Sequence, residues 1–488
     1  MQPGIWFSLA AYFLLMLAIG VYAWMKSTSS SEEYMLGGRN LPPAVAALSA
    51  GASDMSGWLL LGLPGALFVS GLAQSWIGIG LFVGAWINWI VVAPRLRQQT
   101  EQYDNSLTIP GFLGNRFPST ARLLRIVSAV VIVVFFAVYT ASGLVGGGKL
   151  FASAFGSNYM VGVMLTLGIV LIYTVMGGFL AVSLTDFVQG IIMMLALIIM
   201  PIVVLTTDGG NGVGQAAERL TAIDPNFLSL FTGVTFLGWL STVAWGLGYF
   251  GQPHIIVRFM AVRSVADVPK ARNIGMSWMA VSLIGAIAVG IFGRAYAERM
   301  GLEVADPETI FIILANLLFH PLVTGFLYAA LLAAIMSTVS SQLLVASSSL
   351  TEDIYRAAFK RHASERELVN IGRLAVLAVG IVAMTIANNP DSQVLGLVAN
   401  AWAGFGAAFG PLIILSLTWK RMTGAGAVAG LVTGAVVVIA WIALGLSSSF
   451  MGQGLYEIVP GFVAAWIAIV AVSLATPDRG EYRTFKTA

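Results

Sequence analysis

The feature that most constrains this chain is a series of long apolar segments that follow one another from one end to the other. Hydrophobic residues make up 58% of the 488 residues and charged residues only 10%, a balance that is not found in soluble globular proteins of this length. A segment of roughly 20 apolar residues can cross a bilayer as a helix, and about thirteen such segments fit in the chain. We expect the spans near residues 5–25, 42–70, 74–94, 124–148, 159–176, 180–205, 231–256, 274–297, 321–350, 368–387, 395–417, 424–446 and 456–475.

The polar stretches between these spans are all short. We therefore expect a single transmembrane domain over residues 1–476, followed by a short cytoplasmic tail over residues 477–488. With the N-terminus outside, nearly all of the 25 Lys and Arg residues fall in inner loops or in the tail, Arg258 among them, and the exceptions are Lys149, Arg219, Arg294 and Arg299. Basic residues favour the cytoplasmic side, so we predict an outside N-terminus and an inside C-terminus. This topology explains the net charge of +3, which therefore does not predict nucleic-acid binding.

An acidic residue, Asp54, lies among small residues inside the second span, in the run SAGASDMSGW at 49–58. A carboxylate at membrane depth costs roughly 3 kcal/mol or more unless it is compensated, so such residues usually mark an ion or substrate path. The neighbouring glycines and serines allow the backbone to leave the helix and to offer carbonyl and hydroxyl oxygens to a ligand. We predict a broken helix with a binding function here.

A second interruption falls in the run WGLGYFGQPH at 245–254, which holds three glycines and a proline. A continuous α-helix is unfavourable over such a run. One break in an early span and one five spans later is typical of transporters built from inverted repeats, in which the broken helices meet at the midplane. The alternative is a kinked helix whose glycines serve close packing.

Two further groups of polar residues lie inside apolar spans. Ser337, Ser340 and Ser341 share one helical face, with Thr338 beside Ser337. Hydroxyls together with freed carbonyls can hold a small alkali cation, since hard cations need several oxygen ligands. The alternative is that these hydroxyls bond back to their own helix. Asp186 lies inside or near the mouth of another span and is equally explained as a helix-end residue.

Four aromatic residues, Trp58, Tyr139, Trp245 and Tyr249, could line a substrate pocket, although interfacial positions explain each of them singly as well. The three histidines are scattered without metal spacing. The chain also has no recognisable pairing of a nucleophile with a base. We therefore do not expect an enzyme.

Seven segments spread over nearly the whole length resemble the sodium/solute symporter family, and among its members those that import L-proline. No single segment is specific for this family, but the combination of all seven is. The segments are LGGR at 36–39, SAGASDMSGWLLLGLPGA at 49–66, GGFLAVSLTD at 177–186, AWGLGYFGQPHI at 244–255, AAIMSTVSSQLL at 333–344, TEDIY at 351–355 and AWAGFGAAFGP at 401–411.

The resemblance implies an all-α membrane fold of thirteen helices, ten of which form two inverted five-helix repeats whose first helices are broken. It implies a sodium site made by the carbonyls of Ala52, Met55 and Ala334 and the hydroxyls of Ser337 and Thr338, with Asp54 at or near it. It assigns cation coupling, and in some relatives a second cation, to Asp186, with which we group Ser341, and it assigns gating to Arg39. It implies a proline pocket formed by Ser56, Gly57, Trp58, Tyr139, Trp245, Tyr249, Gln252 and Pro253.

The expected function is sodium-driven import of L-proline by alternating access, in the cytoplasmic (inner) membrane of a bacterium. Sodium is then a co-transported ion, the lipid bilayer is the surroundings, and no obligate protein partner is evident. One alternative keeps the mechanism with another small solute, such as an amino or organic acid, a vitamin or a sugar. A membrane sensor built on a transporter scaffold is a further alternative, and a passive channel is less favoured because the paired breaks indicate an occluded midplane site.

Overall fold

The computed structural model describes residues 2–26, 30–207, 212–359 and 362–482. Helices make up nearly all regular structure in this part of the chain, and its one β contact is an isolated bridge between Leu41 and Val262. The α-helices are α1 (Pro3–Lys26), α2 (Ser31–Leu36), α3 (Pro43–Asp54), α4 (Leu63–Ser70), α5 (Ser75–Gln102), α6 (Ile109–Arg116), α7 (Ala121–Phe155), α8 (Tyr159–Thr206), α9 (Gly212–Ile223), α10 (Phe236–Val243), α11 (Pro253–Ala261), α12 (Val268–Met300), α13 (Ile310–Leu318), α14 (Pro321–Ser348), α15 (Glu365–Ile386), α16 (Val394–Thr418), α17 (Gly424–Ala443), α18 (Leu446–Ser449) and α19 (Ile458–Ala475).

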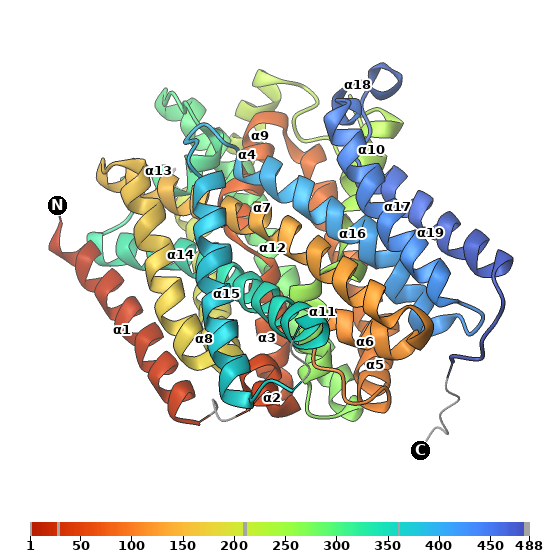
Figure 1. The fold of residues 1–488 in the computed structure, drawn as a ribbon. Helices are drawn as coiled ribbons and strands as arrows, with labels where there is room; N and C mark the ends of the chain where they lie inside the picture. The colour runs from red at the N-terminus through yellow and green to blue at the C-terminus, as the bar shows by residue number, and fades with distance from the viewer. Residues whose placement is uncertain (1, 27–29, 208–211, 360–361, 483–488) are drawn as a thin grey trace.

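The bundle has a buried centre and an apolar rim. In the apolar stretch of each span, the share of residues that are buried inside the molecule is 83% for the span that contains α14 and 78% for α16. It is only 28% for α1 and α19. Figure 1 shows α1 on one side of the molecule and the pair α17 and α19 on the other. The rim helices present large apolar side chains outward, as with Phe7 and Leu14 of α1, which are 71% and 67% exposed. Such surfaces suit contact with lipid.

Helix α8 is a hairpin of two antiparallel halves. Its 48 residues are interrupted at Gly178, whose φ of 56° and ψ of −147° are open only to glycine. The Tyr173 hydroxyl donates to the Met336 carbonyl, and Gln189 donates to the hydroxyl of Tyr12, which itself contacts the Met336 sulfur. In one straight helix these two residues of α8 would stand about 24 Å apart. The separate spans predicted at 159–176 and 180–205 therefore correspond to the two halves.

The first predicted break is present. Helix α3 ends at Asp54, and Met55 leaves the helical region with φ −79° and ψ 78°. The chain then continues through a π-helical turn, Trp58–Gly62, into α4, and the two arms are bent by 60°. The Ser56 amide bonds to the Asp54 carbonyl, so the Ala52 carbonyl loses the partner four residues on that a continuous helix would give it.

The second predicted break is also present. Between α10 and α11 lies a 3-10 stretch, Ala244–Gly251 (η5), followed by Gln252 in an extended conformation. This stretch packs tightly between α5 and α16. A Cβ on Gly246 would come within 2.2 Å of the Gly80 carbonyl oxygen, and one on Gly248 within 1.9 Å of the Trp402 indole nitrogen. The glycines of this run therefore serve both the unwinding and the close packing that we set out as alternatives.

Ten described helices are long and apolar enough to cross a membrane, and the bent pair of α3 and α4 can form another span. The hairpin of α8 and the broken helix of α10 and α11 bring the described part of the chain close to the predicted number of spans, but the exact count and the orientation stay predictions. The structure places several of the basic residues that we expected in loops within helices, as it does Arg97 of α5. We counted Arg258 among the basic residues of inner loops, whereas the structure buries it completely in α11.

Candidate functional site

Helices α3 and α14 meet where the first break frees the backbone. The Ser337 hydroxyl lies 2.7 Å from the Ala52 carbonyl oxygen and 3.1 Å from that of Ala334. The Thr338 hydroxyl lies 3.4 Å and 3.3 Å from the same two oxygens. These four residues are among the five predicted sodium ligands, and all four are buried. Two carbonyl and two hydroxyl oxygens so close together form the kind of neutral oxygen cluster that suits a small alkali cation.

The fifth predicted ligand, Met55, lies at the break itself and is fully buried. Asp54 is placed differently. Its carboxylate is buried, and Oδ2 accepts a hydrogen bond from the Tyr249 hydroxyl. Its Oδ1 has no hydrogen-bond partner among the described residues. Asp54 is therefore close in sequence to Ala52, but its side chain contacts the second broken helix.

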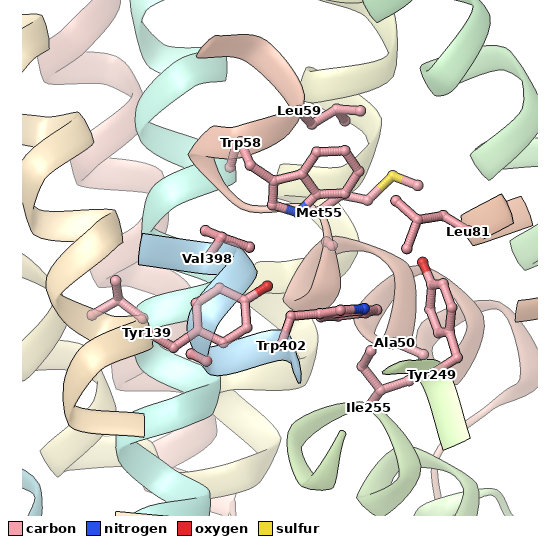
Figure 2. Close-up of a cluster of buried hydrophobic side chains, with 14 of the residues drawn as sticks. Ala50, Met55, Trp58, Leu59, Leu81, Tyr139, Tyr249, Ile255, Val398 and Trp402 are labelled. Atoms are coloured by element: carbon pink, nitrogen blue, oxygen red, sulfur yellow. The ribbon is translucent and has the colours of Figure 1, made fainter. Parts of the chain in front are cut away.

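Aromatic residues surround the break in the first span. Figure 2 shows Trp58, Tyr139, Tyr249 and Trp402 gathered around Met55. Each of these side chains is buried. The Trp58 indole donates to the Asp54 carbonyl over 3.1 Å, and the rings of Tyr249 and Trp402 meet edge to face with centroids 5.1 Å apart. Such an aromatic enclosure can pack an apolar ring and attract an ammonium group.

The remaining predicted pocket residues lie close to this cluster. Ser56, Gly57, Gln252 and Pro253 are buried at the two breaks. Helix α16 holds the second break in place: the Trp402 indole donates to the Trp245 carbonyl over 2.7 Å, and Gln252 donates to the Trp402 carbonyl over 3.1 Å. A cleft of about 630 Å³ reaches Trp245, whose ring stacks on Tyr456 at 5.3 Å.

Asp186 belongs to a buried ion pair that we did not foresee. Its Oδ2 lies 3.2 Å from the Arg258 guanidinium and accepts from the Ser49 hydroxyl over 2.7 Å. Arg258 also donates to the Ser341 hydroxyl over 2.6 Å and lies over the Phe179 ring. Asp186 and Ser341, which we grouped as a second cation position, do come together. The cation beside them is the protein's own guanidinium.

Arg39 contacts two segments that are distant from it in the sequence, residues 100–106 and the end of α11. Its backbone adopts φ 52°, and its guanidinium donates to Thr100 of α5, to the Ser106 carbonyl and to the Met260 carbonyl of α11. Burial, with Arg97 nearby, lowers the pKa of Arg39 to about 10, so the side chain remains charged at neutral pH. The position fits a tether between α5 and the end of the second broken helix, while the gating role stays a prediction.

Three residues of this centre were absent from the predicted site residues: Trp402, Arg258 and Asn88, which donates to the Tyr249 carbonyl over 3.0 Å. Trp402 lies within the quoted AWAGFGAAFGP segment, where an aromatic residue in a glycine-rich helix was the available signal. The charge of Arg258 suggested a loop, and Asn88 carried no signal of its own.

A helical bundle with two broken helices, an oxygen cluster and an aromatic enclosure at the breaks defines the class of membrane transporters. Comparison with known proteins gives the family. The model of the Sodium:solute symporter family matches residues 34–434, and this chain belongs to that family. It is 57% identical over 461 residues to the high-affinity proline transporter PutP of Bacillus subtilis, covering 94% of this chain and 96% of that protein.

Two further relatives are similar over almost their whole length. The osmoregulated proline transporter OpuE of Bacillus subtilis is 53% identical over 480 residues, covering 98% of this chain and 96% of the relative. A sodium/proline symporter of Staphylococcus aureus is 52% identical over 479 residues, covering 97% and 93%.

Solved structures confirm the fold class. A Na⁺-coupled sialic acid symporter in a substrate-bound outward-open state superposes with a TM-score of 0.81 at 19% identity, covering 97% of this chain and 98% of that one. A nucleobase-cation-symport-1 family transporter in a closed conformation gives 0.57 at 14% identity, covering 93% and 98%. At these identities the likeness concerns the fold alone.

Proposed function

We propose that this chain is a sodium-coupled importer of L-proline in the cytoplasmic membrane of a bacterium. The observation that carries the proposal is the contact of Ser337 and Thr338 with the carbonyls of Ala52 and Ala334 at the first break. Membership of a family of sodium-coupled symporters supports the ion. Relatives that are 52–57% identical over nearly the full chain and are named for proline support the substrate.

In this mechanism sodium binds where α3 and α14 meet, with the Met55 carbonyl as a further ligand. Residues Ser56, Gly57 and Trp58 follow this position directly along the chain. An ion that holds the end of α3 against α14 therefore also orders one wall of the substrate pocket. Each ligand then raises the affinity for the other, which is the thermodynamic meaning of coupling.

The zwitterionic substrate would lie between the two breaks. Amides exposed at a helix break favour its carboxylate, and the faces of Trp58, Tyr139, Trp245 and Tyr249 favour the apolar ring and the ammonium. Transport with one sodium ion moves one positive charge, which gains about 2.3 kcal/mol per 100 mV of membrane potential.

Asp54 does not bind the ion. Its carboxylate acts on the sodium site from a neighbouring position, where it accepts a hydrogen bond from the Tyr249 hydroxyl. We also propose that Asp186 and Ser341 hold no second sodium in this state, because the Arg258 guanidinium already provides their counter-charge. Their part in coupling is then to keep α3, α8, α11 and α14 in register.

Uptake of labelled L-proline into proteoliposomes that contain the purified protein tests the proposal. An inward sodium gradient should drive accumulation above equilibrium, and an equal potassium gradient should not. Sodium-driven accumulation of another solute in place of proline would contradict the substrate and keep the mechanism. Sodium-independent flux that does not saturate would contradict the mechanism itself.

A further inference from the structure

Asn88 is an amide side chain in the interior of α5, where its neighbours are mostly apolar. It is 1% exposed, and a buried amide is costly unless it is hydrogen-bonded. Its Nδ2 donates to the Tyr249 carbonyl oxygen over 3.0 Å. This bond joins α5 to the middle of the second broken helix, at the residue whose hydroxyl bonds to Asp54.

The position of Asn88 follows from the helical repeat of α5. Gly80, Gly84 and Asn88 are spaced four apart, so they form one stripe along the helix. A Cβ on Gly80 would lie 2.3 Å from the Val243 carbonyl oxygen, and one on Gly84 would lie 2.2 Å from that of Gly246. The two glycines thus let η5 lie directly on α5, and Asn88 supplies the hydrogen bond that holds it there.

The other half of the Asn88 amide and the Asp54 carboxylate belong to the same cavity. Its Oδ1 has no hydrogen-bond partner among the described residues, and neither has Oδ1 of Asp54. Both residues line one cavity of about 20 Å³, whose other lining residues, apart from Tyr249, are apolar or carry an indole. A cavity of this size holds about one water molecule. Two buried acceptors that share such a cavity are both satisfied by one water-sized donor.

We propose that Asn88 is a positioning residue for both transported ligands. Through its amide nitrogen it fixes the Tyr249 backbone at the substrate pocket, and through one water molecule in the cavity it fixes the Asp54 carboxylate. The part that concerns proline rests on the function proposed above. The part that concerns sodium rests on the role proposed there for Asp54 and does not depend on the identity of the substrate.

Three variants separate this role from general packing. Asn88→Leu removes both polar groups and keeps the number and branching of the side-chain heavy atoms, although its two methyl groups are larger than the atoms that they replace. Asn88→Asp keeps the volume and an oxygen at this position, but in its ionised form it cannot donate to the Tyr249 carbonyl. Gln99→Leu is the matched control, because Gln99 lies on the same helix and donates to the Leu417 carbonyl over 3.1 Å, and its buried Oε1 likewise has no hydrogen-bond partner in the described part of the chain.

The first measurement is the sodium dependence of the thermal unfolding midpoint of the purified protein in detergent, with potassium keeping the ionic strength constant. A ligand that binds the native state raises the midpoint as its concentration rises. Asn88→Leu should need about ten-fold more sodium for the same rise, the effect expected for one buried hydrogen bond, and Gln99→Leu should match the unmodified protein. This readout does not require proline, so it remains decisive even if the substrate assignment fails.

The second measurement is the KM for proline in proteoliposomes, which both Asn88 variants should raise about ten-fold while largely keeping the maximal rate. Lithium activation should weaken by the same factor as sodium activation if the cavity holds water. Unchanged sodium dependence in Asn88→Leu, or an unchanged proline KM in Asn88→Asp, would overturn the inference. If the substitution changes the ratio of lithium activation to sodium activation, the cavity holds a cation and the proposed water molecule is wrong.

Discussion

Replacing Ser337 by alanine should weaken sodium activation strongly while leaving the fold intact. The Ser337 hydroxyl is 2.7 Å from the Ala52 carbonyl and 3.1 Å from that of Ala334. It is therefore one of the oxygens that surround the proposed ion position. One contact between a neutral oxygen and a charged partner contributes about 1.5–3 kcal/mol. The sodium concentration for half-maximal uptake should therefore rise roughly ten- to hundred-fold.

The assay is the initial rate of proline uptake over a series of sodium concentrations at constant ionic strength. Thr338→Val is measured alone and combined with Ser337→Ala. If both hydroxyls bind the same ion, the two effects should fail to add, with a coupling energy of about 0.5–3 kcal/mol. Ser348→Ala is the matched control, because this buried serine of α14 donates back to the Leu344 carbonyl of its own helix and makes no other hydrogen bond through its hydroxyl among the described residues.

Two results would refute the reasoning. One is a Ser337→Ala protein with normal sodium activation, which would place the ion elsewhere. The other is simple additivity of the two substitutions, which would mean that the hydroxyls act at separate positions. A loss of sodium activation in Ser348→Ala as large as in Ser337→Ala would show that the effect reflects damage to α14 in general.

Three further predictions concern other parts of the centre. Asp54→Asn keeps the shape of the side chain and removes its charge, so the sodium requirement for uptake should rise about ten-fold. The unfolding midpoint without sodium should stay the same, and an unaltered sodium requirement would contradict the proposed role. Arg258→Leu leaves Asp186 buried without its partner, which costs about 3–5 kcal/mol of stability, and thermal unfolding should show this loss. Adding Asp186→Leu in the same chain should restore most of the stability, whereas a further loss would contradict the ion pair. Gly246→Ala forces a Cβ to within 2.2 Å of the Gly80 carbonyl oxygen, so the unfolding midpoint should fall by the equivalent of about 1–3 kcal/mol, and an unchanged midpoint would show that η5 can move away from α5.

The sequence predicted the breaks and the hydroxyl face because both depend on local properties. Glycine, serine and proline make a helix unfavourable wherever the chain runs, and the placement of Ser337 and Thr338 on α14 follows from helical geometry alone. The division of α8 into two spans was also predictable, since the pair Gly177–Gly178 interrupts an apolar run that is too long for one crossing.

The contacts that complete the site were not predictable, because they join helices that are far apart in the sequence. Arg258 pairs with Asp186 across 72 positions, and Trp402 bonds to Trp245 across 157. The charge of Arg258 suggested a loop by the usual rule for membrane proteins, and only the buried partner explains why it lies inside. Asn88 looks like an ordinary polar residue until η5 is placed against α5.

The hairpin of α8 has a consequence for how the chain enters the membrane during synthesis. Its halves turn at Gly178, where an added Cβ would lie 2.6 Å from the Tyr34 carbonyl oxygen. No loop separates the two crossings, because helical residues adjoin the turn on both sides, and residues 159–206 contain no Lys or Arg of their own to select a side of the bilayer. The two halves must insert together, as one unit, and their direction is set by the spans that precede and follow them.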